Sequence, residues 1–396
     1  MTTDYSFPEK AYPAYSCYQD YLNHQKNKNL YRQLRQPLTA DKLSQAIFFN
    51  QNDYLHLSHH PEVIAASQAY ARNWGVGSGS SGILSYLPIY QQLENRIART
   101  KHKEHALIFN SGYQTNASVI ATLLDKRLFT EPPLIFCDRL NHASIHHGCQ
   151  LAGVRQIRYR HLDLDHLDEL LQSHQNQKQA KFIITESIFS MDGDQVNIAE
   201  LVALAQKHRA FLYVDEAHAT GASGKQGYGL TSGYETDIDL IMGTFSKAIG
   251  ATGGYICCNQ LIYHYLINRC RGFIYSTAPS PAIIGAVDQA WQLILKLEDS
   301  RKHLMQLANY TRRTLQEHGF NTGQSSSHII PIIIGNEKET LNLYHMLKTE
   351  GIYTSAIRPP TVPAHSSRLR IGLQANHSRN MVDRLINLLR KFTHGT

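Results

Sequence analysis

The feature that most constrains this 396-residue chain is an alternation of short apolar runs with amphipathic stretches between about residues 105 and 285. The runs are LIF near 107, LIFCD ending at Asp138, KFIITE at 181–186, AFLYVDE at 210–216 and DLIMGTF at 239–245. Between two of them, Asn197-Ile-Ala-Glu200 is typical of a helix start with a capping box. Strands that alternate with helices favour a mostly parallel sheet with crossover helices. The sequence therefore predicts an α/β fold.

The flanking segments lack this alternation and predict a division into three parts. Residues 1–55 are polar, contain one candidate helix near 18–34, and are expected to form an N-terminal arm that packs against other parts. Residues 56–285 are the predicted large domain. Residues 286–396 predict a smaller C-terminal α+β domain. Its expected elements are a long helix near 282–318, a strand at HIIPIII, a helix near 337–350 and a strand before Arg358.

The composition excludes several classes of protein. Charged residues make up 18% of the chain, below the usual value of roughly 25%. No run of like charges reaches the length typical of a nucleic-acid-binding tail, and the net charge of +7 is compatible with anionic partners such as phosphates, carboxylates or an acidic carrier protein. The six cysteines form no CxxC pair, which predicts reduced, buried thiols. Without a signal-peptide pattern or a long apolar run, we expect a cytoplasmic protein that does not bind membranes.

Two patterns resemble functional motifs but have the wrong context. Gly77-Ser-Gly79-Ser-Ser-Gly82 matches GxGxxG, which binds dinucleotides only where it joins a strand to a helix. The preceding residues, PEVIAASQAYARNW, are helix-like, so a flexible glycine turn near a site is expected. His142, His146 and His147 lie close in sequence without an HExxH glutamate or a second cluster at ligand spacing, so no metal site is predicted.

Polar groups follow three of the predicted strands. Ser111-Gly112-Tyr113 follows LIF, and its backbone amides could hold a phosphate at a helix N-terminus. Asp215 and His218 follow FLYV, and a carboxylate there could hold a protonated heteroaromatic nitrogen. In isolation these residues are equally compatible with a helix-capping aspartate beside a solvated histidine.

The third group is Thr244-Phe-Ser246-Lys247, followed by small residues. A lysine at a strand end before a glycine-rich turn suits a buried amine that forms a Schiff base, with the two hydroxyls near a phosphate. Taken alone it is more typical of a surface-loop lysine. The order of phosphate turn, Asp-x-x-His and lysine, each after its own strand, is the layout of a pyridoxal-phosphate enzyme with the aspartate-aminotransferase fold.

From about Gln51 to its end, the chain resembles the α-oxoamine synthases, which condense an amino acid with an acyl thioester and lose carbon dioxide. The resemblance lies in NDYLHLSHHPEV, FNSGYQTNASVI, DRLNHASI, TESIFSMDGD, VDEAHATGASGKQGYG, TFSKAIGATGGY, IYST, AIRPPTVP and RLRIGL. It implies the fold type I architecture of pyridoxal-phosphate-dependent transferases, pyridoxal 5'-phosphate as cofactor, and a homodimer with shared active sites.

Within this family, AIRPPTVP favours the branch that joins L-alanine to a pimeloyl thioester, on coenzyme A or acyl carrier protein, to make 8-amino-7-oxononanoate in biotin biosynthesis. Sister activities stay open: glycine C-acetyltransferase, 5-aminolevulinate synthase, serine palmitoyltransferase and α-aminoketone signal synthase. A non-catalytic relative acting as a scaffold would be expected to lack Lys247, which is present.

The resemblance also assigns roles around the cofactor ring. Lys247 matches the Schiff-base lysine, which also takes the α-proton of the amino acid. Asp215 matches the residue that keeps the ring nitrogen protonated, and His142 matches the imidazole that stacks on the ring. His218 and Ser190 match the groups around the ring 3-oxygen.

Further matches concern the phosphate and the substrate. Gly112 and Tyr113, with Thr244, match the phosphate cradle, and Thr277 of IYST matches a residue that reaches the phosphate from the neighbouring subunit. Arg370, the second arginine of RLRIG, matches the residue that binds the substrate carboxylate. Asn52 matches a polar residue near that carboxylate, and Arg32 or Arg35 is a candidate to reach the acyl group.

Two departures from the family pattern concern the acyl donor. His56 stands where the family commonly has glycine in NDYLGL. Ser85–Tyr90 is one residue shorter than its family counterpart, with Tyr86 or Tyr90 where glycine and histidine are expected. We predict added bulk near the acyl entrance and an altered preference for the acyl donor.

Overall fold

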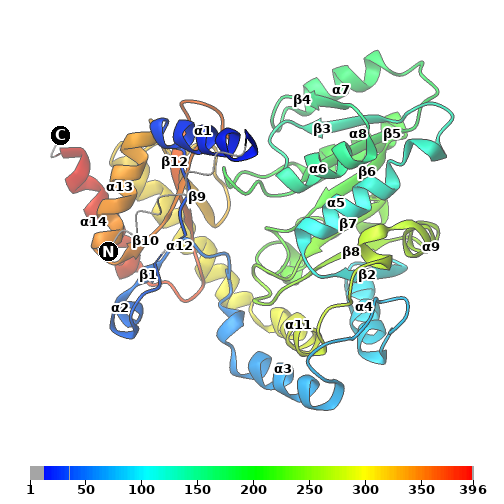
Figure 1. Ribbon diagram of the computed structural model, residues 1–396, viewed down its shortest axis with the longest axis horizontal. Helices are drawn as coiled ribbons and strands as arrows, with labels where there is room; N and C mark the ends of the chain where they lie inside the picture. Colours follow the sequence, from blue (N-terminus) through cyan, green and yellow to red (C-terminus); the bar gives the residue numbers. More distant parts are fainter. Residues whose placement is uncertain (1–12, 35, 395–396) are drawn as a thin grey trace.

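A seven-stranded sheet forms the centre of the larger lobe in the computed structural model, which describes residues 13–34 and 36–394 (Figure 1). In spatial order the strands are β2 (His105–Phe109), β8 (Gly254–Cys258), β7 (Leu240–Thr244), β6 (Phe211–Asp215), β5 (Lys181–Glu186), β3 (Leu134–Asp138) and β4 (Gln156–Tyr159). Within this sheet, β8 runs in the opposite direction to the other six strands. The predicted α/β fold is confirmed, although β4 and β8 were not among the expected strands.

Alternate residues of the strands contact helices on opposite faces of the sheet, as the pleat requires. Ile183 and Leu212 belong to one apolar cluster, whereas Phe182 and Tyr213 belong to the other. The first cluster includes α4 (Pro88–Thr100), α7 (Leu164–Ser173), α8 (Ile198–His208) and α11 (Pro281–Leu293). The second includes α5 (Gly112–Leu123), α6 (Ala143–Ala152) and α9 (Gln260–Arg269). Burial on both faces explains why the strands are almost continuously apolar.

The smaller lobe combines the C-terminal third of the chain with its N-terminal segment (Figure 1). Its antiparallel sheet has the order β11 (Ser355–Ile357), β12 (Ser367–Gly372), β9 (Ile329–Gly335). The helices of this lobe are α12 (Glu298–Glu317), α13 (Glu337–Thr349) and α14 (Arg379–His394). From the N-terminal segment, which includes α1 (Pro13–Asn27) and α2 (Ala40–Gln45), β1 (Ile47–Phe48) pairs in parallel with β10 (Ile352–Tyr353). The expected strand at HIIPIII, the helix near 337–350 and the strand before Arg358 are thereby found.

The single long helix expected at 282–318 is wrong. α11 and α12 are separate helices, because Leu297 leaves the helical conformation at φ −99° and ψ 31°. The guanidinium of Arg301 donates to the carbonyl of Ile294 and so satisfies a backbone group that the break frees.

The N-terminal helix ends at Asn27 rather than near 34, and Asn29 follows with φ 57°. The domain limits at 55 and 285 stay predictions; residue 285 lies inside α11.

The lobes meet at the loop between β5 and α8, residues 187–196. Ser326 and Ser327 donate their amides to the carbonyl of Gly193, both at 3.0 Å. Gly193 has φ 69°, and a Cβ there would lie 1.9 Å from the carbonyl oxygen of Ile329. Glycine is therefore the residue that this contact requires.

Five of the six cysteines are buried free thiols, but Cys17 is exposed, so the expectation of burial was wrong for that residue. Within the described residues, no helix has the length and apolarity needed to cross a bilayer. The cytoplasmic location stays a prediction.

A fully buried ion pair fixes the segment after β6. The amine of Lys101 lies 2.6 Å from a carboxylate oxygen of Glu216, and both side chains are 0% exposed. The amine also donates to the carbonyl of Tyr228, and Glu216 accepts from the amide and hydroxyl of Thr231. Burial alone would lower the pKa of Lys101, but the Glu216 carboxylate more than offsets this and raises it. The pair thus holds Glu216, the residue next to Asp215, in one place.

Replacing Lys101 with methionine should lower the free energy of unfolding by about 3–5 kcal/mol, because it leaves the Glu216 carboxylate buried without its cation. Urea unfolding followed by circular dichroism measures this. The control is Arg313→Met, which breaks an exposed pair with Glu317 at 3.6 Å, with side chains 70% and 61% exposed. It should cost less than about 1 kcal/mol. Equal losses in the two variants would contradict the prediction.

Candidate active site

Lys247 lies three residues after the end of β7, and its side-chain amine forms no hydrogen bond to any described residue, whereas its backbone carbonyl accepts from the amide of Gly250 at 2.9 Å. Burial lowers the pKa of its amine to about 8, the carboxylates of Asp215 and Glu186 oppose this, and the guanidinium of Arg370 adds to the lowering. Asp215 and Glu186 are the last residues of β6 and β5, and Arg370 lies within β12, so side chains from three strands act on one amine. A lysine in this state has a free, partly neutral amine near physiological pH.

The lowered pKa predicts how the protein without cofactor takes up pyridoxal phosphate. Because a neutral amine is required, the loading rate should rise about tenfold per pH unit below about pH 8 and then level off, whereas an ordinary lysine has a pKa of about 10.4. Stopped-flow absorbance at fixed cofactor concentration measures this rate. A lysine peptide is the control, and a protein rate that still climbs between pH 9 and 10 would contradict the assignment.

Asp215 is buried, and its carboxylate is held from two sides. Oδ1 accepts from the amide of Ala217 at 2.8 Å, and Oδ2 accepts from the amide side chain of Asn116 at 2.7 Å. Asn116 in turn accepts from the hydroxyl of Tyr213 at 2.7 Å and donates to Ser144 at 2.9 Å. These contacts fix the carboxylate at the position where the sequence predicts a partner for a cationic ring nitrogen.

His142 is the N-cap of α6, and its ring is exposed rather than buried in the core. Its amide donates to Glu186, and Nδ1 lies 2.7 Å from the hydroxyl of Ser144. Desolvation by the surrounding protein lowers the pKa of the imidazole. The Asp215 carboxylate opposes this shift, and the Lys247 amine adds to it. The ring therefore presents a neutral, accessible face beside the lysine. Glu186 was not predicted as a site residue, although it lies within the quoted segment TESIFSMDGD.

A network centred on Tyr54 connects the predicted substrate residues. Its hydroxyl lies 2.7 Å from Nδ1 of His218, 3.1 Å from Oδ1 of Asn52 and 3.3 Å from the guanidinium of Arg370. Arg370 also donates to Asn52 at 3.1 Å and to the backbone carbonyl of Ser190. Residues separated by more than 300 positions thus meet at one fully buried hydroxyl. Tyr54 was missed, and its only sequence signal was its place in NDYLHL beside Asn52.

Burial lowers the pKa of His218 well below its usual range, and the cations of Lys247 and Arg370 add to the effect. The imidazole is therefore neutral at ordinary pH. The Tyr54 contact at Nδ1 leaves its other nitrogen to interact with a bound group.

The predicted phosphate turn has the expected geometry. Ser111 is the N-cap of α5, and its side chain accepts from the amide of Gln114 at 3.1 Å. A Cβ at Gly112 would lie 3.2 Å from both Cβ and Oγ1 of Thr244. A glycine here keeps the helix N-terminus open beside the Thr244 hydroxyl, as a phosphate cradle requires. Tyr113 lies at the surface, with its hydroxyl 3.2 Å from Nδ1 of His147.

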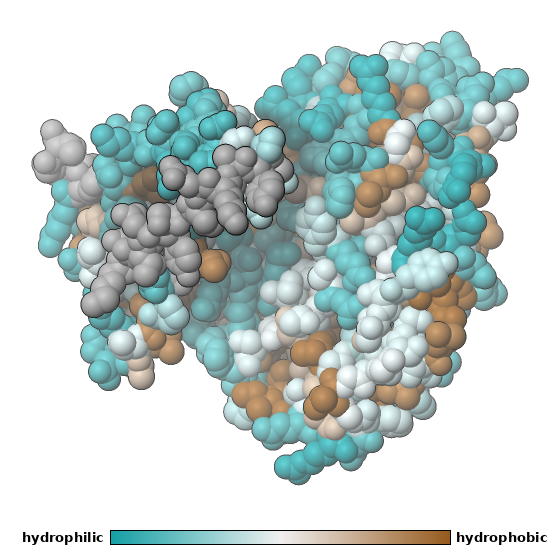
Figure 2. All heavy atoms as spheres, viewed as in Figure 1, coloured by the Kyte–Doolittle hydropathy of each residue, from teal (hydrophilic) through white to brown (hydrophobic). Residues whose placement is uncertain are grey.

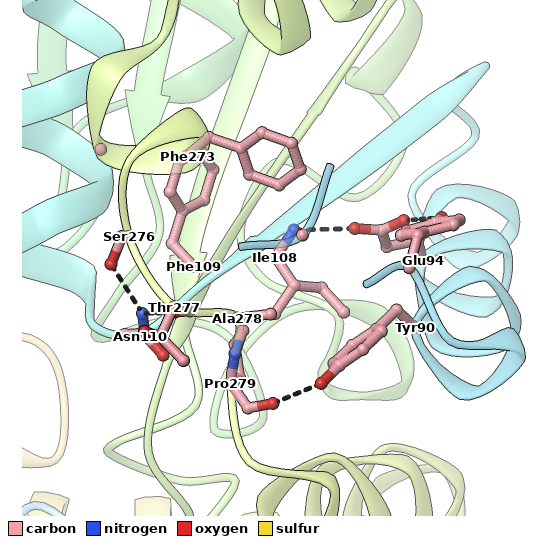
Figure 3. Close-up of a pocket in the computed structure, with 13 residues that line it drawn as sticks. Tyr90, Glu94, Ile108, Phe109, Asn110, Phe273, Ser276, Thr277, Ala278 and Pro279 are labelled. Atoms are coloured by element: carbon pink, nitrogen blue, oxygen red, sulfur yellow. Dashed lines mark hydrogen bonds between the residues drawn. The ribbon is translucent and has the colours of Figure 1, made fainter. Parts of the chain in front are cut away.

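Thr277 lies apart from Lys247, in the hollow drawn in Figure 3. Its backbone carbonyl accepts from Asn110 at 2.7 Å, next to the phosphate turn. The hollow is also lined by Tyr86 and Tyr90, whose hydroxyls donate to Glu94 and to the carbonyl of Pro279. The shortened segment 85–90 therefore adds its bulk beside Thr277. Whether this alters the acyl entrance stays a prediction.

The remaining predicted residues lie in other surroundings. Arg32 donates to the hydroxyl of Thr361 at 3.0 Å and lines a small hollow with Arg358, and Arg35 lies outside the described residues. His56 has φ 57° and ψ 32°, the left-handed region that explains why the family commonly has glycine there. The glycine run at 77–82 follows helix α3 (Pro61–Trp74) rather than a strand, as expected.

His146 and His147 contact different partners, Gln156 and Tyr113. Among the described residues, no three His, Cys, Asp or Glu side chains are grouped to hold a metal ion.

The residues around Lys247 fit pyridoxal phosphate in chemistry and space. A free amine can bind the aldehyde, a buried carboxylate can face the ring nitrogen, and an open helix N-terminus can hold the phosphate. The Arg370 guanidinium remains for a substrate carboxylate. Figure 2 shows a furrow between the two lobes.

Comparison with known proteins agrees with this geometry. The sequence model of the family "Aminotransferase class I and II" matches residues 44–389. A protein of Magnetococcus marinus with the provisional name 8-amino-7-oxononanoate synthase is 49% identical over 333 residues, covering 84% of each chain. The 8-amino-7-oxononanoate synthase of Gluconacetobacter diazotrophicus is 48% identical over 344 residues, covering 86% of each.

Solved structures agree as well. A serine palmitoyltransferase from S. paucimobilis with bound PLP superimposes with a TM-score of 0.83 at 27% identity, covering 88% of each chain. The 8-amino-7-oxononanoate synthase from Francisella tularensis has a TM-score of 0.76 at 26% identity, covering 89% of this chain and 98% of its own. The fold type I architecture and the pyridoxal-phosphate cofactor are thereby confirmed. The chain belongs to the class I and II aminotransferase family and, within it, to the pyridoxal-phosphate-dependent acyltransferases of the α-oxoamine synthase group.

Proposed function

We propose that the protein condenses L-alanine with a pimeloyl thioester, carried by coenzyme A or acyl carrier protein, to give 8-amino-7-oxononanoate for biotin biosynthesis. The α-carbon of alanine bonds to the acyl carbonyl carbon, the carbon–sulfur bond breaks to release the thiol, and the alanine carboxylate leaves as carbon dioxide. The convergence of the free Lys247 amine with the Arg370 guanidinium carries the proposal. The names of relatives at 45–49% identity support the choice of substrates.

The residues divide the work of this reaction. Arg370, held by Ser190, Asn52 and Tyr54, binds the alanine carboxylate with a planar pair of donors. This orients the α-hydrogen toward Lys247, whose amine, with its pKa near 8, accepts the proton. Bound pyridoxal phosphate supplies the electron sink that makes this proton acidic. The carboxylate of Asp215 would hold the protonated ring nitrogen, and the imidazole of His142 would cover one face of the ring.

We also propose that the protein acts as a homodimer with shared active sites. Support comes from the exposed apolar side chains on and near the glycine turn, namely Val76, Ile83, Leu84 and Tyr275. Thr277 lies in this region and would reach the phosphate bound by the partner subunit. The small-molecule partners are an amino acid and an acyl thioester.

The direct test mixes the holoprotein with L-alanine and pimeloyl-coenzyme A. We expect one equivalent each of free thiol and carbon dioxide per 8-amino-7-oxononanoate, detected by a thiol reagent and by mass spectrometry. A pimeloyl acyl carrier protein tested in parallel identifies the carrier. Absence of thiol release with both donors would refute this function.

The structural likeness to serine palmitoyltransferase favours one alternative, the condensation of serine with a long-chain acyl thioester. A panel of α-deuterated amino acids separates the two. We expect L-alanine to lose its deuteron fastest, and faster loss from serine or glycine would favour a sister activity.

A further inference from the structure

His161 lies on the turn between β4 and α7, and both of its ring nitrogens face a carboxylate. Nδ1 is 2.9 Å from Asp138, and Nε2 is 2.9 Å from Asp194. The side chains of His161, Asp138 and Asp194 are 13%, 0% and 8% exposed. Since a carboxylate only accepts hydrogen bonds when ionised, both ring nitrogens must carry a proton. His161 is therefore an imidazolium placed between two buried anions.

Among the described residues, the imidazolium of His161 has no charged partner besides these two carboxylates. Asp138 and Asp194 are the charged groups that act on the ring, while Phe189 packs edge-on against it at 4.5 Å. The neighbouring Arg160 is directed to Asp163, at 2.7 Å. Burial alone would lower the pKa of His161, but hydrogen bonds to both carboxylates raise it to about 10. The other oxygen of Asp194 has no hydrogen-bond partner among the described residues, so His161 alone compensates this carboxylate.

Each carboxylate belongs to a loop that carries a residue of the active site. Asp138 ends β3, and its Oδ1 also accepts from the amide of Leu140 at 2.8 Å, within the loop that leads to His142. The backbone carbonyl of Asp194 accepts from the amide of Phe189 at 3.1 Å and so closes the loop that carries Ser190. The two loops follow neighbouring strands, β3 and β5.

We propose that His161 is a positioning residue, whose imidazolium joins the loop carrying His142 to the loop carrying Ser190. It thereby fixes the imidazole that covers the cofactor ring relative to Arg370, which donates to the Ser190 carbonyl. The roles of His142 and Arg370 rest on the proposed function. Without His161, two buried carboxylates face each other and repel, so the loops separate. A displacement of 1 Å at such a site can lower turnover by about 100-fold.

The first measurement concerns the ring itself. In the wild-type protein labelled with ¹⁵N-histidine, His161 should show both N–H groups at pH 8.5, where an ordinary histidine is neutral. The resonances are assigned by their loss in His161→Gln. A neutral His161 at this pH would overturn the proposal, whatever the variants do.

The second measurement uses a pair of variants and a control. His161→Gln removes the charge and leaves one donor for two carboxylates. In His161→Gln with Asp194→Asn, the glutamine nitrogen can donate to Asp138 and the glutamine oxygen can accept from the new asparagine amide, so one buried carboxylate remains in place of two. The control is His166→Gln, five residues along the same segment, where Nδ1 accepts from the amide of Arg160 at 2.9 Å and a glutamine oxygen can do the same.

His161→Gln should weaken pyridoxal-phosphate binding at least about tenfold by equilibrium dialysis and lower the kcat for α-deuteron loss by about 10- to 100-fold, with a smaller change in the KM for L-alanine. The double variant should recover most of both losses, and the control should match wild type. If His161→Gln matches the control, or the double variant recovers stability but neither cofactor affinity nor kcat, His161 is not a positioning residue. Absence of thiol release from wild type would refute the proposed function alone, because the ring state and cofactor affinity still test His161.

Discussion

Replacement of Lys247 by alanine should abolish measurable turnover, a loss of at least about 10⁴-fold, the upper end of what a positioned proton-transfer group contributes. The same amine is proposed to attach the cofactor and to accept the α-proton, so no other group is placed to take over either task. Thiol release and α-deuteron loss from L-alanine should both fall to background. Borohydride treatment followed by digestion should leave a pyridoxyl group on the peptide containing residue 247 in wild type and on no peptide in the variant.

The control for this variant is Lys103→Ala. Lys103 is another partly buried lysine with a pKa lowered by burial, and its amine donates to the carbonyl of Ile238 near the start of β7, at the opposite end of that strand from Lys247. It should retain turnover within about threefold of wild type. If Lys247→Ala keeps more than one per cent of turnover, the assignment of the amine is wrong.

The second large effect is expected at Asp215. Asp215→Asn keeps the shape of the side chain but removes the negative charge, and it leaves one oxygen to accept from either Ala217 or Asn116, where the carboxylate accepts from both. An adjacent carboxylate shifts the pKa of a cationic partner by about 1–3 units, and each unit corresponds to a factor of ten. We therefore expect kcat, measured by thiol release, to fall about 10- to 1,000-fold, and calorimetry to show the lower melting temperature expected from the loss of one buried hydrogen bond.

Asp239→Asn is the matched control, because Asp239 accepts from the amide of Leu212 at 2.7 Å near the starts of β6 and β7, remote from the lysine. It should alter stability more than turnover. An Asp215→Asn variant with wild-type kcat would show that the carboxylate does not act on the cofactor ring.

The sequence was sufficient to predict those parts of the site that follow from local pattern. Each of Ser111, Asp215 and Lys247 stands directly after an apolar run, and parallel strands bring such positions to one edge. Strand β8 escaped prediction because GYICC follows the glycine-rich turn of the lysine motif without a helix between them. A connection that short can lead only to an antiparallel neighbour, and its direction is set by pairing rather than by local residues.

The contacts of Tyr54 and His161 could not be predicted for a different reason. A hydrogen bond between Tyr54 and His218 spans 164 residues, and those of His161 span 23 and 33. No periodicity links such positions, because the two partners of each bond lie in different segments that only the tertiary fold brings together. The break at Leu297 depends similarly on Arg301, whose donation to the Ile294 carbonyl stabilises a bend that helix propensity alone disfavours.

Gly193 has a consequence for how an amino acid is held at both of its ends. The amine proposed to accept the proton, that of Lys247, belongs to the larger lobe, and the guanidinium proposed to bind the carboxylate, that of Arg370, belongs to the smaller lobe. The distance between these two groups therefore depends on how closely the two lobes pack together. The backbone of Gly193 packs directly against the backbone of Ile329, so no flexible side chain could move aside to make room for a Cβ. A single methyl group at this position would push the two lobes apart. The distance between the Lys247 amine and the Arg370 guanidinium would then exceed the length of a small amino acid. The absence of a Cβ atom at Gly193 thus sets the width of the cleft between the two lobes.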